Sequence, residues 1–186
     1  MWFVSKQRCI RVAGLGLALI LWLPLVGALG AAETEASALV GGGGGSPFSE
    51  LAKSSSVLVG LDLGLGDLNE ARIVRSIQAI YDSPNGNVRG KKFGGLAVEH
   101  LTIEAKPGYA IGAIEAWGGA RLDGLSATFM RRRGSQLDRT DAYESRWLGG
   151  RGGSVHTKLG GSGHLVLGVH GRGGDDLDAF GIMIEK

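Results

Sequence analysis

The chain has 186 residues, 44% of them hydrophobic, which is enough for one globular domain with a buried core. Glycine contributes 34 residues, well above a typical share of about 7%, but it shows no period of three, so a collagen-like chain is excluded. The formal net charge is +2, yet three of the 20 basic residues lie within the first 30 positions. Without that segment 17 basic residues face 18 acidic ones, which argues against nucleic-acid binding.

Residues 1–30 have the three parts of a secretory signal peptide. Basic residues between Lys6 and Arg11 precede an uncharged run from Val12 to Gly30 that ends in small residues. The alternative is an uncleaved membrane anchor, because this run approaches the roughly 20 residues that span a bilayer. The only cysteine, Cys9, lies in this segment, so no disulfide can stabilise the exported domain. We expect a secreted, periplasmic or cell-surface protein that meets a membrane only if residues 1–30 are retained.

Residues 31–40 are predicted to be a linker, because they have little apolar surface to bury. Five glycines follow, Gly41 to Gly45, and alone they fit a flexible spacer as well as they fit a binding loop. From Val57 to Leu65 every odd position is apolar, which is the period of two expected for a half-buried strand.

The remaining apolar runs are also short and are separated by glycine or proline turns. No segment after residue 30 has the periodicity of a helix. This pattern predicts an all-β fold, in the form of a sandwich, a barrel or a prism. The predicted strands lie within residues 72–81, 97–104, 109–117, 122–130, 164–170 and 179–184.

The motifs expected of an enzyme are incomplete. The glycines near Lys91 and Gly64 lack the spacing of a phosphate-binding loop. The four histidines have neither paired helical spacing nor cysteine partners for zinc. Ser154 and His156 lack the strand-to-helix turn that exposes a catalytic serine. We therefore expect a protein that is not an enzyme and that uses no metal and no cofactor.

One basic cluster stands out, Arg131 to Arg133. Asp138, Asp141 and Glu144 follow it closely, so the cluster is predicted to be a solvated segment balanced by acids. A site for an anionic partner is the alternative.

The stretch GRGGDDLDAFG, residues 171–181, places Asp175, Asp176 and Asp178 beside glycines. It lacks the alternating ligands and the closing glutamate of a calcium-binding hand. Its glycines allow successive backbone N–H groups to form a concave donor site, and an ionised carboxylate supplies strong acceptors. Donors beside a charged acceptor suit a ligand whose groups both donate and accept, such as the hydroxyls of a sugar.

Taken in order, several segments resemble the jacalin-related lectin family, and in particular its bacterial-type members, over about residues 40–185. The resemblance rests on the glycine cluster with a following aromatic, on the G-x-x-x-D motif before the last apolar strand, and on the segments between them. These are GGGGGSPF, ARIVRSIQAIY, VEHLTIEAKPGYAIGAIEAWGG, RLDGLSATFM, YESRWLGGRGG and LVLGVHGRGGDDLDAFGIMI.

This resemblance implies a lectin domain over residues 41–186 with the β-prism I fold, three four-stranded sheets around a pseudo-threefold axis. It also implies a metal-independent site for a mannose/glucose-type or galactose-type mono- or oligosaccharide. The carboxylate of Asp178 would accept from two sugar hydroxyls, and the backbone N–H groups of Asp175, Asp176 and Leu177 would bind sugar oxygens. Gly174 begins this motif, and the N–H of Gly45 would complete the site.

Two departures from the family bear on this expectation. Asp176 adds a negative charge beside the site, and His170 stands where a bulky aromatic residue is more usual. The alternative is a structural or protein-interaction module whose sugar site no longer binds. Either reading allows a homo-oligomer.

Overall fold

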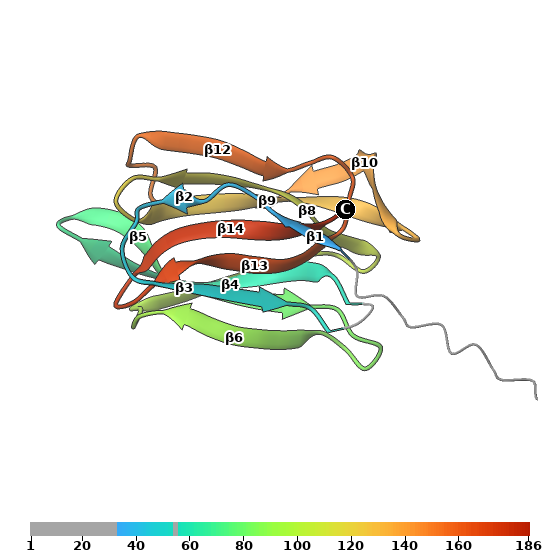
Figure 1. Ribbon diagram of the computed structural model, residues 1–186, viewed down its shortest axis with the longest axis horizontal. Coiled ribbons are helices and arrows are strands. Elements are labelled where there is room, and N and C mark those ends of the chain that lie inside the picture. The colour runs from blue at the N-terminus through green and yellow to red at the C-terminus, as the bar shows by residue number, and fades with distance from the viewer. Residues whose placement is uncertain (1–32, 54–55) are drawn as a thin grey trace, which may run out of the picture. The chain divides into compact units, whose positions relative to one another are not determined.

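A computed structural model describes residues 33–53 and 56–186 (Figure 1). The regular secondary structure in these ranges consists of β-strands. The predicted signal peptide, residues 1–30, lies outside them. No helix within the described ranges is long and apolar enough to cross a membrane. The strands are β1 (Thr34–Ala36), β2 (Val40–Gly41), β3 (Ser46–Leu51), β4 (Leu58–Leu68), β5 (Ala71–Tyr81), β6 (Val88–Gly94), β7 (Glu99–Glu104), β8 (Tyr109–Gly118), β9 (Leu122–Arg133), β10 (Gln136–Glu144), β11 (Leu148–Gly149), β12 (Val155–Gly160), β13 (Val166–Gly173) and β14 (Leu177–Glu185).

These strands form three antiparallel sheets. Sheet A contains β1, β2, β3, β13 and β14, sheet B contains β4 to β7, and sheet C contains β8 to β12. Each sheet has a central hairpin, which is β13–β14 in sheet A, β4–β5 in sheet B and β8–β9 in sheet C. Figure 1 shows β13 and β14 side by side in red, with β3 beside β13.

Two of the sheet edges are interrupted strands. β1 and β2 pair with successive parts of β14, and β10 and β11 pair with successive parts of β9. When each interrupted edge is counted once, every sheet has four strand positions. The structure therefore confirms the predicted all-β fold of three four-stranded sheets.

Within the segment predicted to be a linker, residues 31–40, the backbone takes part in sheet A from Thr34 onward. Residues 34–36 pair with residues 183–185, and Ser37 N–H donates to the carbonyl of Ile182 over 2.9 Å. Val40 is 1% exposed and belongs to the core. The segment has few apolar side chains, but its backbone supplies partners for the edge of β14, and hydropathy does not reveal that role.

One main apolar core receives side chains from all three sheets. Leu63 and Ile77 come from sheet B, Phe129 from sheet C and Phe180 from sheet A, and all are at most 2% exposed. Burying each contributes about 1.5–3 kcal/mol. The run predicted at Val57–Leu65 does form a strand from Leu58, with a register shift between Leu58 and Gly60. Val57 and Val59 lie in a smaller second cluster, whereas Leu58 lies in the main core.

Each sheet repeats one arrangement of glycines beside its central hairpin. Gly41, Gly149 and Gly94 have φ angles of 124°, 92° and 92°, a region that favours glycine. In each case the following residue donates its N–H to a carbonyl of the central hairpin, over 2.8, 2.8 and 2.9 Å. The acceptors are Asp178 for Gly42, Asp123 for Gly150 and Arg75 for Gly95.

The three donor glycines also connect the sheets in a ring. A Cβ atom at any of them would collide with a backbone carbonyl of the neighbouring hairpin, so the backbones approach closely there. The contacts run from sheet A to C, from C to B and from B back to A, as the pseudo-threefold symmetry of a prism requires. The contacting pairs are Gly42 with Ala120, Gly150 with Arg72 and Gly95 with Asp175.

His170 on β13 makes the stability of this fold depend on pH. Its Nε2 atom is buried against Gly181 without a hydrogen-bond partner among the described residues, and burial lowers the pKa of the imidazole. Because the pKa is depressed in the folded state, the stability is fully present above the unfolded value of about 6.5 and is lost as the pH falls through the folded pKa. We expect the free energy of unfolding to fall below pH 6.5 in the wild type and to fall less in His170→Phe.

Urea unfolding between pH 5 and pH 8 measures this effect. The difference in slope between the two proteins should not exceed about 1.4 kcal/mol per pH unit, the value for one proton. His164→Gln is the control, because His164 is exposed. Equal slopes for the wild type and His170→Phe would contradict the expectation.

Candidate functional site

Strand pairing brings together two segments that are about 130 residues apart in the sequence. The glycine loop, Gly41–Gly45, is held at one end by the pairing of Gly41 with Ala179 and at the other by that of Ser46 with Gly173. Both partners flank the turn of the β13–β14 hairpin. The loop therefore lies against the aspartate turn, Gly174–Asp178, as the sequence predicted.

The carboxylate of Asp178 is the acidic group at the centre of this contact. Asp178 is 7% exposed, and its oxygens face Gly44 and Gly45. A Cβ atom at Gly45 would lie 2.5 Å from Oδ2 of Asp178, and the φ of Gly45 is +59°, so glycine is required there on both counts. Within the described residues no group donates a hydrogen bond to this carboxylate, which leaves its acceptors free for a ligand.

Arg172 holds the glycine loop in place. Its Nε donates to the carbonyl of Gly44 and its Nη2 to the carbonyl of Gly45, each over 2.7 Å. The planar guanidinium fork suits two adjacent acceptors, so the loop is fixed by a bidentate contact. Sequence reasoning missed this residue, although its place two residues before the aspartate turn was a usable signal.

Asp176 uses its carboxylate inside the protein. It is 5% exposed, and its Oδ2 accepts from Nε of Arg121 over 2.6 Å. Its Oδ1 forms an ion pair with Nη2 of Arg75 at 3.0 Å. Arg121 precedes β9 in sheet C and Arg75 lies on β5 in sheet B, so this one carboxylate joins all three sheets. The negative charge noted in the sequence is therefore compensated, and only the backbone of Asp176 remains for a ligand.

The other members of the aspartate turn differ in exposure. Gly174 and Asp175 are exposed, whereas the side chain of Leu177 is fully buried in the core. Gly174 donates its N–H to the carbonyl of Asp176 over 2.9 Å, and the carbonyl of Asp175 accepts from Arg75 over 3.3 Å. The structure thus gathers Gly174 and Asp178 beside Gly45, whereas Asp175 lies against Gly95.

Comparison with known proteins agrees with this architecture. No protein-family model matches the chain, and no curated protein sequence matches it. Among solved structures, frutapin from Artocarpus incisa superposes with a TM-score of 0.65 at 20% identity, over 84% of this chain and 99% of its own. Artocarpin complexed with methyl-α-mannose gives a TM-score of 0.63 at 20% identity, over 84% and 99%. A mannose-binding jacalin-related lectin from Ananas comosus gives 0.60 at 19% identity, over 83% and 97%.

The chain has the fold of the jacalin-related lectins. The prism I architecture expected from the sequence is therefore confirmed.

A pocket of about 630 Å³ adjoins the aspartate turn of this prism. It shares Gly174 and Asp175 with the turn, and Arg75, Lys92 and the loop at residues 94–96 form its other walls. Leu96 is 89% exposed, so the rim of the pocket combines an apolar side chain with two cationic ones. The pocket continues the candidate site toward sheet B.

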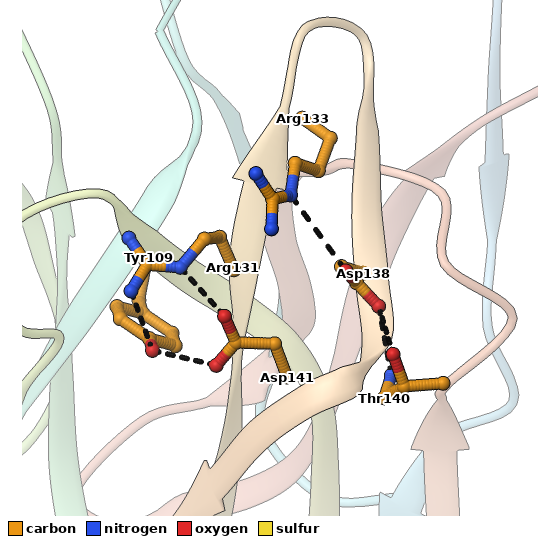
Figure 2. A network of polar contacts seen from close by, with 6 residues as sticks. All are labelled: Tyr109, Arg131, Arg133, Asp138, Thr140 and Asp141. Atoms are coloured by element: carbon orange, nitrogen blue, oxygen red, sulfur yellow. Dashed lines mark hydrogen bonds and ion pairs between the residues drawn. The ribbon is translucent and has the colours of Figure 1, made fainter.

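The arginine cluster of the prism is paired with acids, which confirms the prediction of a balanced segment. Arg131 contacts Asp141 at 2.7 Å and Arg133 contacts Asp138 at 3.6 Å, as Figure 2 shows. Arg132 pairs at 2.6 Å with Asp82, which lies 50 residues away in the sequence. Hydrogen bonds from Tyr109 and from Arg131 lower the pKa of the Asp141 carboxyl. This cluster does not present three free positive charges to an anionic partner.

Within residues 33–53 and 56–186 no group of three or more His, Cys, Asp or Glu residues is placed to hold a metal ion. His156 contacts Glu115 at 2.6 Å and stacks on Trp117, with ring centroids 4.6 Å apart. Both partners lie on β8, which pairs with the strand of His156, so these contacts join neighbouring strands of sheet C.

Proposed function

We propose that this chain is an exported, non-catalytic lectin that binds a sugar between the glycine loop and the aspartate turn. The observation that supports the proposal best is the carboxylate of Asp178, which is held against Gly44 and Gly45 without an internal hydrogen-bond donor. Because none of the described residues donates to this carboxylate, its oxygens are available to accept hydrogen bonds from a ligand.

The chemistry of the site suits sugar hydroxyls. The carboxylate of Asp178 would accept hydrogen bonds from two neighbouring hydroxyls, and charge-assisted bonds of this kind are the strong ones. Backbone N–H groups of Gly45, Asp175, Asp176 and Leu177 would donate to oxygens of the sugar. The glycines leave no Cβ atoms in the way, so the ring can approach the backbone closely.

The structural neighbours support a mannose-type ligand as the first to test, because artocarpin is complexed with methyl-α-mannose and the Ananas comosus lectin is described as mannose-binding. The adjoining pocket has room for further sugar units of an oligosaccharide. Its walls include Lys92, whose ammonium group can donate to a strongly hydrogen-bonding unit there.

Binding of one sugar at a single site is expected to be weak, with a Kd of about 1 mM, which corresponds to a binding free energy of about −4 kcal/mol. Useful avidity then requires several sites that act together on one glycan surface. Export through residues 1–30 would place the protein where such surfaces occur.

A glycan array tests the proposal with the full chain and with Asp178→Asn. We expect the wild type to bind glycans that end in mannose, glucose or galactose. The variant should lose about 10–100-fold in affinity, because a hydrogen bond to a charged group contributes about 1.5–3 kcal/mol. Asp67→Asn is the matched control, since Asp67 is exposed at the end of β4 and should leave binding unchanged.

Two results would count against the proposal. Absence of glycan binding by a folded wild-type chain would favour the protein-interaction module over the lectin. Binding that survives Asp178→Asn would place the sugar elsewhere on the molecule. Circular dichroism of each variant establishes that the fold is retained.

A further inference from the structure

The pattern of the candidate site occurs a second time, in sheet C. Gly119-Ala120-Arg121-Leu122-Asp123 repeats the spacing of Gly174-Asp175-Asp176-Leu177-Asp178, including the leucine before the aspartate. A second glycine loop, Gly149–Gly153, follows β11 as the first loop follows β2. Both motifs flank the turns of central hairpins, β8–β9 in sheet C and β13–β14 in sheet A.

The geometry of the second pair matches that of the first. Gly153 has a φ of +74°, as Gly45 has +59°. A Cβ atom at Gly153 would lie 2.6 Å from Oδ2 of Asp123, and one at Gly45 would lie 2.5 Å from Oδ2 of Asp178. The second loop is also tied down by a side chain, because Nε1 of Trp147 donates to the carbonyl of Gly150 over 3.0 Å.

Asp123 is a buried carboxylate that the fold does not use. It is 9% exposed, and its Oδ2 is buried without a hydrogen-bond partner among the described residues. Burial raises the pKa of this carboxyl, which means that the charged form is costly in the folded protein. By contrast Asp176, on the neighbouring hairpin, contacts two arginines.

The pseudo-symmetry of the prism does not by itself require an aspartate at this position. In sheet B the equivalent acceptor of the loop N–H is Arg75, and the β4–β5 turn contains only Asn69 and Glu70 between its strands. Sheet B therefore has the same arrangement of strands and loop although an arginine, Arg75, stands at the equivalent position. The architecture therefore does not depend on a carboxylate at this position, and the oxygens of Asp123 are available to a ligand.

We propose that Asp123, together with Gly152, Gly153 and the backbone of the β8–β9 turn, forms a second carbohydrate-binding site. The inference rests on the proposed function of the first site, because it assigns the same sugar chemistry to the same geometry. The two sites differ in their surroundings. Arg151, whose guanidinium lies 4.9 Å from the centre of the Trp147 ring, takes the place of a glycine in the first loop. A different preference among glycans is expected as a result.

The experiment is a titration of the ¹⁵N-labelled full chain with methyl-α-mannoside, and in parallel with methyl-α-galactoside, followed by the amide shifts of the two glycine loops. The variants are Asp178→Asn, Asp123→Asn and Gly152→Ala. A Cβ atom at Gly152 would lie 3.6 Å from Oδ1 of Asp123, an ordinary contact, so this variant covers the carboxylate without straining the fold.

We expect each of the two loops to shift with at least one of the two sugars in the wild type. Asp178→Asn should retain the shifts of Gly149–Gly153, and Asp123→Asn and Gly152→Ala should retain only those of Gly41–Gly45. Shifts confined to Gly41–Gly45, which Asp178→Asn abolishes and Gly152→Ala leaves unchanged, would overturn the second site and leave the proposed function intact. Absence of shifts at both loops with both sugars would overturn the two assignments together.

Discussion

Gly45→Ala is expected to abolish sugar binding at Asp178 and to destabilise the protein by about 2–3 kcal/mol. A φ of +59° costs a residue with a Cβ atom about 1–2 kcal/mol. The new methyl group would also lie 2.5 Å from Oδ2 of Asp178 and 2.6 Å from the carbonyl carbon of Gly173, so the loop or the aspartate must move. Glycan-array binding and urea unfolding measure the two effects separately.

Gly134→Ala is the matched control for this variant. Gly134 has a φ of +63°, close to that of Gly45, but a Cβ atom there would have no neighbour within 4 Å. It should cost only the backbone strain of about 1–2 kcal/mol and leave sugar binding unchanged. If both variants lose the same stability and both bind sugar, the close packing of Gly45 on Asp178 is not important for the site.

Asp176→Asn is expected to destabilise the protein by about 2–3 kcal/mol at neutral pH. Removing one partner of a buried ion pair costs about 3–5 kcal/mol, and the value is reduced here because Arg75 and Arg121 are 26% and 34% exposed. The variant also weakens the contact between the three hairpins, so affinity for sugar should fall with stability. Thermal and urea unfolding measure the loss.

Asp123→Asn makes the same chemical change, but we expect it to stabilise the folded protein at neutral pH. The folded pKa of Asp123 is raised, so its stabilising contribution is present below the unfolded value of about 3.9 and is lost as the pH rises through the folded pKa. At pH 7 the variant should therefore unfold at a higher temperature than the wild type, and at pH 3 the two should be similar. A lower melting temperature at pH 7 would show that Asp123 is bonded within the fold.

The fold was predictable because the residues that form it carry local signals. Alternating apolar positions such as those between Val57 and Leu65 mark strands, and glycines such as Gly41 and Gly149 mark the places where the backbone needs a positive φ. The proximity of the glycine loop and the aspartate turn was predictable for a similar reason. A carboxylate and bare backbone at Gly174–Asp178 are the groups that the chemistry itself requires, and their order along the chain matched a known family.

The remaining features depend on how the sheets close. The partners of Asp176 are 55 and 101 residues away in the sequence, and only the ring of sheets brings Arg121 and Arg75 to it. The short strand at residues 34–36 is defined by the edge of β14 that it covers. The second motif was present in the sequence, but Arg121 stands where the first motif has Asp176 and Arg151 interrupts its glycine loop, so composition concealed the repeat.

The pairing of β1 with β14 has a consequence for how the chain can be cut and rejoined. Lys186 donates its N–H to the carbonyl of Glu33 over 2.9 Å, so these two residues, 153 positions apart, are neighbours in space. A short peptide could join them, and the chain could be reopened at Gly134 in the β9–β10 hairpin, where a Cβ atom would meet no neighbour within 4 Å. Such a circular permutant would retain all three sheets and would reverse the order in which the two glycine loops are synthesised.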